Sequence, residues 1–171
     1  MDLIQLLNDR EERWKRKTEI LRCTGKTVVS LTLRMPNEIR RTKEAERVLE
    51  RAAGDVQALL TNAFGAVSCE GMFLSCDGPY ALFSVAGGGI EVKKALIRFE
   101  EESRFGEVID ADVMTNEDKE ISRTDVGGKE RTCLVCGGSD ARLCVRNKSH
   151  SREDTEKIIY ALVIKKLYQG E

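Results

Sequence analysis

The chain has 171 residues, 41% of them hydrophobic and 33% charged, and its formal net charge at pH 7 is -1. This length and apolar content predict a single folded domain, residues 1–171, with a core of its own. The balanced charge argues against bulk binding of nucleic acid, which requires a basic excess. No apolar run approaches about 18 residues, so the sequence predicts no membrane-spanning helix.

The expected chemical state of the cysteines depends on the compartment in which the protein works. The N-terminal segment MDLIQLLNDREER is too short and becomes acidic too early for a signal peptide, so we expect a cytoplasmic protein. In the cytoplasm its six cysteines are expected to be thiols or metal ligands rather than disulfides. Cys23, Cys69 and Cys76 show no ligand spacing and are interpreted as buried thiols.

The first predicted element is a helix over residues 2–22, because its apolar residues follow helical spacing. The middle of the periodic stripe is basic, with Arg10, Arg13 and Lys17 where a core-facing helix would be apolar. Such a run of charges is usually a solvated helix face. The alternative interpretation is a cationic strip that faces an anion.

The next six predicted elements suggest a fold class. Alternating β-branched stretches and amphipathic stripes predict, in order, a strand over 27–33, a helix over 45–60, strands over 65–75 and 80–86, a helix over 90–103 and a strand over 105–113. This is the order of a ferredoxin-like β-α-β-β-α-β sheet. The predicted fold is therefore α+β, with an antiparallel sheet, both helices on one face and a core at about 27–125. The N-terminal helix is an addition, as are a Cys/His loop and a C-terminal helix over 131–169.

Asp110 and Asp112 form a carboxylate pair in the last predicted strand. Side chains two residues apart in a strand point the same way, roughly 7 Å apart along the backbone. Like charges so placed repel each other, and a divalent cation between them would relieve the repulsion. Enzymes of phosphoryl transfer hold Mg²⁺ in this manner. A solvent-facing strand with two acidic residues is the alternative, because D-x-D alone is a weak signal.

The C-terminal part gathers Cys133, Cys136, Cys144 and His150, which is the only histidine of the chain. Zinc takes tetrahedral sets of three cysteines and one histidine, and C-x-x-C is the usual half-site. The spacing is compatible with a structural zinc site. The alternative is three reduced cysteines packed as small hydrophobic residues, with His150 preceding a helix capped by Ser151.

Several short motifs follow one another along the N-terminal half and the centre of the chain. Residues 6–16 carry L-L-x-x-R-x-E-R-x-x-R, residues 30–32 match S-[LF]-T, and residues 36–40 match P-G-x-[IV]-K with Asn37 and Arg40 in place of its glycine and lysine. Residues 106–113 stand at the central signature, G-R-L-x-D-I-D-V.

Three more motifs follow in the C-terminal part. Residues 122–125 match S-R-R-D, residues 131–136 match R-x-C-L-x-C, and residues 144–150 match C-x-R-x-[KR]-x-H. In this order, and over essentially the whole chain, the sequence resembles the apo-citrate lyase phosphoribosyl-dephospho-CoA transferases, also called citrate lyase holo-acyl-carrier-protein synthases.

The resemblance implies a nucleotidyltransferase. It would move the prosthetic group of 2′-(5″-triphosphoribosyl)-3′-dephospho-CoA to a serine of the apo acyl carrier protein of citrate lyase, and pyrophosphate would leave. Asp110 and Asp112 would hold Mg²⁺, with Asp125 as a third carboxylate or as the base for the serine. Guanidinium groups suit phosphate oxygens. The expected phosphate contacts are Arg10, Arg13, Arg16, Arg40, Arg123, Arg146 and Lys148, and part of this basic surface could instead dock the acidic carrier.

The chain also departs from the family pattern. Glu107 stands where the family usually has arginine, which reverses a charge beside the expected metal site, and Lys17 replaces a glutamine. Two alternatives therefore stay open at this stage. One is a non-catalytic zinc-binding interaction module, and the other is a nucleotidyltransferase with a different donor or acceptor.

Overall fold

The computed structural model describes residues 3–117, 119–138 and 140–168. The ends of the predicted domain, including the expected first residue of the N-terminal helix and the last of the C-terminal helix, lie outside the described residues. Among the residues that are described, no helix is long and apolar enough to cross a membrane.

The predicted helices and strands are present, with bounds that differ by a few residues. In chain order the elements are α1 (Leu3–Thr24), β1 (Thr27–Leu33), α2 (Asn37–Arg40), α3 (Lys43–Phe64), β2 (Val67–Phe73), β3 (Tyr80–Val85), α4 (Gly89–Glu102), β4 (Ile109–Met114), β5 (Glu120–Ile121), the 3-10 helix η1 (Thr124–Val126), α5 (Ala141–Arg146) and α6 (Arg152–Tyr168). Ser151 caps α6 as expected, because its Oγ accepts a hydrogen bond from Asp154 N at 3.0 Å. The short elements α2, β5, η1 and α5 were not predicted.

The strands form one antiparallel sheet in the order β2-β3-β1-β4-β5. The α+β class and the antiparallel sheet are therefore confirmed. The expectation that the Asp110/Asp112 strand would be the last one was wrong, because β5 continues the sheet by pairing Ile121 with Val113. A strand of two residues is too short to show an alternating pattern in the sequence.

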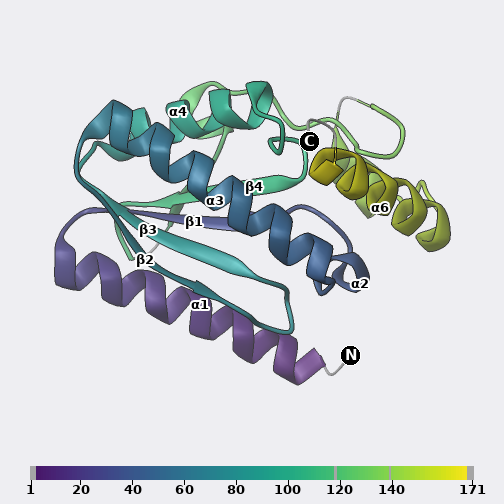
Figure 1. Cartoon of the computed structure of the whole chain (residues 1–171), viewed down its shortest axis with the longest axis horizontal. Coiled ribbons are helices and arrows are strands. Elements are labelled where there is room, and N and C mark those ends of the chain that lie inside the picture. The colour runs from purple at the N-terminus through teal and green to yellow at the C-terminus, as the bar shows by residue number, and fades with distance from the viewer. Residues whose placement is uncertain (1–2, 118, 139, 169–171) are drawn as a thin grey trace.

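Side chains along the strands point alternately to the two faces of the sheet, and a different layer covers each face (Figure 1). On one face, Val29, Leu31 and Leu33 of β1 join the main hydrophobic core with α3 and α4. The stripe of α3 that contains Val48 and Leu60 is fully buried there, and each such side chain contributes roughly 1.5–3 kcal/mol by leaving water. The opposite face is covered by α1, the long helix at the bottom of Figure 1.

Side chains on the α1 face are far more polar than those of the core. Thr32 and Asp110, like Ser30 and Asp112, are register partners on β1 and β4 and face this side. Lys17 of α1 is buried here with only 6% of its side chain exposed. The basic middle of α1 therefore faces the sheet, which agrees with the cationic-strip interpretation rather than with a solvated face.

The interpretation of three cysteines as buried thiols was wrong. All six cysteines carry free thiols, but Cys23 and Cys69 are exposed and Cys76 is only partly buried. Cys23 lies in the last turn of α1, and Cys69 lies on β2, an edge strand with no fully buried residue.

Candidate active site and Cys/His cluster

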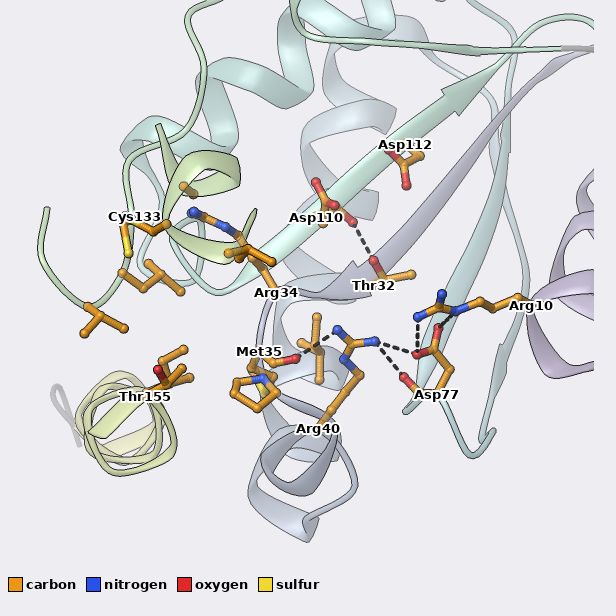
Figure 2. A pocket seen from close by; sticks show the side chains of 18 of the residues that line it. Arg10, Thr32, Arg34, Met35, Arg40, Asp77, Asp110, Asp112, Cys133 and Thr155 are labelled. Atoms are coloured by element: carbon orange, nitrogen blue, oxygen red, sulfur yellow. Dashed lines mark hydrogen bonds and ion pairs between the residues drawn. The ribbon is translucent and has the colours of Figure 1, made fainter. Parts of the chain in front are cut away.

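A pocket of about 910 Å³ opens between α1, the ends of β1 and β4, and the segment from Cys133 to α6. Figure 2 shows its charged side, where Asp110 and Asp112 project from β4 and Arg10, Arg40 and Asp77 lie below them. The other side includes apolar side chains, among them Met35 and Ile159. A concave site with few convergent charges and an apolar wall is typical of a ligand-binding site.

Asp110 and Asp112 lie on the same side of β4, as the spacing predicted (Figure 2). Burial raises the pKa of Asp112 to about 7, and the negative charges of Asp110 and Glu120 add to this rise. Ser30 is the register partner of Asp112, and its buried Oγ has no hydrogen-bond partner in the described structure. Carboxylates in mutual repulsion beside an unsatisfied hydroxyl are a donor set that fits a hard cation such as Mg²⁺.

The backbone before this pair requires a glycine. A Cβ atom on Gly106 would lie 2.1 Å from the carbonyl oxygen of Glu100, so no larger residue fits where the chain leaves α4. The close approach lies shortly before β4, on the segment that leads to Asp110.

Glu120 is a pocket residue that sequence reasoning missed. It comes from β5 and forms an ion pair with Lys17 of α1. Both residues act on Asp112, because Glu120 raises its pKa and Lys17 lowers it. The signal that could have revealed Glu120 is its position shortly after the strand of the two aspartates, where a returning edge strand brings it beside them.

Arg10, Arg13 and Arg40 converge on the carboxylate of Asp77, a residue that sequence reasoning did not select. Arg10 Nε is 3.1 Å from Asp77 Oδ2, and Arg40 NH1 is 2.9 Å from Asp77 Oδ1 (Figure 2). The Asp77 side chain is only 2% exposed, so it holds the guanidinium groups in fixed directions. Three cations around one anion leave a net positive charge at this end of the pocket.

The turn that carries Asp77 also depends on a glycine. Gly78 has a φ of +99°, and a Cβ there would come within 2.2 Å of Arg40 Cγ. Glycine is therefore needed both for the left-handed backbone and for the approach of the Arg40 side chain. The sequence C-D-G-P over residues 76–79 is typical of a turn, but its role in orienting Arg40 could not be read from the sequence.

A second, smaller pocket of about 270 Å³ lies on the outer side of β4. Arg34, Asp110 and Asp112 line both pockets, so the two meet at the aspartate pair. Arg123 and Arg131 line only the smaller one. Burial lowers the pKa of Arg34, and the positive charge of Arg131 lowers it further.

The Cys/His cluster forms one wall of the larger pocket. The ligand atoms of Cys133, Cys136, Cys144 and His150 all lie within 4.8 Å of one another. Cys133 Sγ is 3.4 Å from His150 Nε2, and Cys136 Sγ is 3.7 Å from Cys144 Sγ. Tetrahedral zinc with Zn–S bonds of about 2.3 Å keeps its sulfurs roughly 3.8 Å apart. The cluster can therefore hold a metal ion such as zinc.

The thiols of the cluster influence one another's protonation. Burial would raise the pKa of Cys133, but hydrogen bonds from the backbone N–H groups of Cys136 and Val135 and from neighbouring thiols lower it to about 6. Burial raises the pKa of Cys144 to about 11, together with its hydrogen bonds to Cys136 and Cys133. The pKa values of Cys133 and Cys144 therefore shift in opposite directions. A bound cation would favour the thiolate form of every cysteine in the cluster at once.

Several predicted residues do not reach the larger pocket. Asp125 accepts a hydrogen bond from Ser122 N and pairs with Lys119, so it lies in an exposed turn outside both pockets. Arg16 packs over the ring of Phe73, with 4.5 Å between its Cζ and the ring centre. The remaining predicted phosphate contacts are divided: Lys148 lines the larger pocket, Arg123 lines the smaller one, and Arg146 lines neither.

The charge reversal at Glu107 does not affect the aspartate pair directly. Glu107 lines neither pocket, and its Oε2 is 2.5 Å from Lys166 Nζ of α6. The residue therefore links the turn before β4 to the C-terminal helix.

Fold and site together define a class: an α+β protein with paired carboxylates and cationic side chains, suited to the chemistry of phosphate groups. The sequence matches the family model described as apo-citrate lyase phosphoribosyl-dephospho-CoA transferase over residues 1–166. Proteins with that name from Shigella flexneri serotype 5b (strain 8401) and Escherichia coli O1:K1 / APEC are each 30% identical over 159 residues, which is 93% of this chain and 86% of the relative.

A third relative is longer. "Protein CitXG" of Leuconostoc mesenteroides subsp. cremoris is 30% identical over 154 residues, or 88% of this chain, and the match covers 32% of that protein. The chain thus spans about a third of the length of this relative. With these matches, the chain belongs to the apo-citrate lyase phosphoribosyl-dephospho-CoA transferase family and is a transferase of that type.

Proposed function

We propose that the chain transfers the phosphoribosyl-dephospho-CoA group of 2′-(5″-triphosphoribosyl)-3′-dephospho-CoA to a serine of the apo acyl carrier protein of citrate lyase. The serine oxygen forms a bond to the innermost phosphorus, the bond from that phosphorus to the next phosphate breaks, and pyrophosphate leaves. The observation that carries the proposal is the Asp110/Asp112 pair on the floor of a cationic pocket, in a chain of this family. Such a displacement needs positioning and charge neutralisation more than a covalent nucleophile.

Asp110 and Asp112 would hold Mg²⁺ in this reaction, with the unsatisfied hydroxyl of Ser30 beside them. Mg²⁺ bound there would neutralise charge on the reacting phosphate and on the leaving pyrophosphate. The serine proton has to pass to a base. Asp125 was the expectation from the sequence, but it lies outside both pockets. Among the carboxylates that line the larger pocket, Glu120 is the one not assigned to the metal or to the arginines, so we propose Glu120 for this role.

Arg10, Arg13 and Arg40 would bind phosphates of the donor. Asp77 orients them before the ligand arrives, which reduces the ordering cost of binding. Lys148 lies across the same pocket and is suited to a further phosphate contact. The cavity volume of about 910 Å³ is at the upper end of the roughly 300–1,000 Å³ range of small-molecule sites, as a ligand of nucleotide size requires.

The Cys/His cluster would hold one structural Zn²⁺. All four positions of the tetrahedron would be filled by protein atoms, so this ion would have no place for a substrate. The non-catalytic zinc module is excluded as the function of the chain, because the chain belongs to a family of transferases. A different donor or acceptor remains the alternative within the nucleotidyltransferase class.

We also propose a ferredoxin-like arrangement for the β1-α3-β2-β3-α4-β4 core. The strand order β2-β3-β1-β4 and the shared core of α3 and α4 support it. A cytoplasmic location is consistent with six free thiols.

The direct test is the intact mass of an apo citrate lyase acyl carrier protein after incubation with this chain, the triphosphoribosyl donor and Mg²⁺. We expect the carrier mass to rise by one phosphoribosyl-dephospho-CoA group. A carrier whose acceptor serine is replaced by alanine is the control and should stay unmodified. An unchanged mass of the wild-type carrier, with donor and carrier of verified integrity, would contradict the proposed reaction.

A further inference from the structure

The smaller pocket lies next to the aspartate pair but has no role in the reaction as described so far. It lies beside the outer edge of β4 and is lined mainly by charged side chains, among them four arginines and four carboxylates. Its volume of about 270 Å³ lies just below the roughly 300–1,000 Å³ range of sites for drug-sized ligands. This space suits two linked phosphate groups and is too small for a nucleotide with a pantetheine arm.

Cationic side chains of this pocket are held in place by hydrogen bonds to the unpaired backbone edge of β4. Beyond β5 no strand covers this edge in the described structure, and side chains bind its backbone instead. Lys93 Nζ donates to the carbonyl of Ala111 at 2.7 Å, and Glu100 Oε1 accepts from Ala111 N at 2.9 Å. Arg131 donates to the carbonyl of Ile109 at 2.8 Å and forms an ion pair with Glu100. Arg131 is therefore held in place before any ligand binds.

Arg34 completes the wall at the junction of the two pockets. Its backbone N–H donates to Val108 O at 2.8 Å, and its guanidinium donates to the carbonyl of Thr132. Within the described part of the chain, Arg34 forms no ion pair with a carboxylate, although the charges of Asp110 and Glu100 act on it from nearby. It is partly buried beside Arg131, whose NH2 is 3.5 Å from Asp110 Oδ1. Two neighbouring guanidinium groups, one of them without an ion-pair partner among the described residues, form a site that a bound anion would complete.

We propose that Arg34 and Arg131 bind the pyrophosphate end of the donor and hold it as it leaves. This inference rests on the proposed function, because that reaction supplies the pyrophosphate. An in-line displacement has its entering and leaving oxygens on opposite sides of the phosphorus. The larger pocket then receives the serine and the nucleotide part, and the smaller pocket receives the leaving group. Arg10, Arg13 and Arg40 remain for the phosphates that the donor keeps.

Calorimetric titration with inorganic pyrophosphate and Mg²⁺ tests this site without donor or carrier. We expect Arg34→Gln to weaken pyrophosphate binding by about tenfold or more, as for the loss of a charge-assisted contact. Arg10→Gln should change the affinity much less. Arg98→Gln is the matched control, because Arg98 is exposed on α4 and lines neither pocket. Loss of pyrophosphate binding on Arg10→Gln, with binding retained on Arg34→Gln, would overturn the proposal.

A second measurement uses the wild-type protein and so does not depend on whether a variant folds. Pyrophosphate with Mg²⁺ should protect Arg34 from modification by an arginine-selective dicarbonyl reagent, read by peptide mass spectrometry, and should leave Arg98 unprotected. Equal modification of Arg34 with and without pyrophosphate would also overturn the proposal.

The outcomes also separate this proposal from the proposed function. If the carrier protein stays unmodified while Arg34 is protected and Arg34→Gln loses pyrophosphate binding, the proposed acceptor fails and the pyrophosphate site stands. If transfer occurs without these effects, the site fails and the function stands.

Discussion

Asp112 lies where burial and two neighbouring carboxylates all disfavour its charged form. Asp110→Asn and Asp112→Asn should each reduce transfer by on the order of 10³-fold or more, because Mg²⁺ would lose a ligand worth several kcal/mol at the transition state. Folding should survive, since each change removes like-charge repulsion. The rate of prosthetic-group transfer under saturating donor is the measurement.

Asp125→Asn is the matched comparison for this prediction. Its carboxylate lies outside both pockets, paired with Lys119, so we expect transfer to fall by less than about tenfold. A loss as large as that of Asp110→Asn would restore Asp125 as a catalytic carboxylate. Near-normal transfer by both Asp110→Asn and Asp112→Asn would remove the aspartate pair from the mechanism.

The raised pKa of Asp112 gives a second prediction, on pH. Between roughly pH 4 and 7 the folded protein keeps a proton on Asp112 that the unfolded chain has lost, because the pKa rises from 3.8 to about 7 on folding. The contribution of Asp112 to the stability of the metal-free protein should therefore fall as pH rises through this window and level off above it. Mg²⁺ competes with that proton, so its affinity should increase by up to about tenfold per pH unit below about pH 7.

Thermal midpoints and Mg²⁺ titrations at pH 6 and pH 8 measure both effects. Asp112→Asn is the control, because it cannot release the proton. The difference between wild type and variant isolates the contribution of Asp112 from that of other groups that titrate in this range, such as Cys133. An equal Mg²⁺ affinity of the wild-type protein at the two pH values would show that Asp112 is not the group with which the ion competes.

The residues of the candidate site differ in how well they could be predicted from the sequence. Asp110 and Asp112 could be predicted, because the period of a strand alone puts them on one side. Asp77 could not, since C-D-G-P reads only as a turn and the convergence on it joins α1 to a distant hairpin. Glu120 was missed for a related reason, because its strand is only two residues long.

At the scale of elements, the strands and long helices could be predicted because each carries a periodic pattern over several residues. The exception concerns the surroundings of α1 rather than its presence, because its basic positions resemble a solvated face. Lys17 and Arg13 are sheltered instead because the sheet face opposite them is polar, with Asp112 and Ser30 on it. The burial of a charged stripe depends on the partner surface, which no single helix pattern contains.

The strand β4 shows the same dependence on distant parts of the chain. Its inner edge pairs with β1, whereas its outer edge is held by side chains from α4 and from Arg131. Glu100 and Lys93 are almost fully buried although they sit in a helix of otherwise mixed polarity. Paired buried charges of this kind are costly to break, so the network fixes the strand that carries the aspartates. This role could not be predicted from the helical spacing alone.

For the whole molecule, the sequence predicted a sheet-based core and a separate Cys/His segment, and the structure brings the two together at one pocket. Cys133 and His150 line the same cavity as Asp110, although the cluster lies outside the sheet. The Cys/His segment contributes few residues to the main core, so a metal bound by the cluster would supply much of its order. A structural ion would then support donor binding without taking part in the chemistry.

The last prediction concerns this ion. Protein purified without added metal should contain one zinc per chain by elemental analysis. Removal with a zinc-selective chelator, in excess Mg²⁺, should increase hydrogen exchange over residues 131–151 and weaken donor binding, while the amides of β1 and β4 stay protected. Cys136→Ser should reproduce these effects, because it removes one of four ligands. Cys69→Ser is the matched control, since Cys69 is an exposed thiol outside the cluster. Zinc well below one per chain, with Cys136→Ser as stable as the wild type, would mean that the cluster is a group of packed thiols and that His150 is free to act in the pocket.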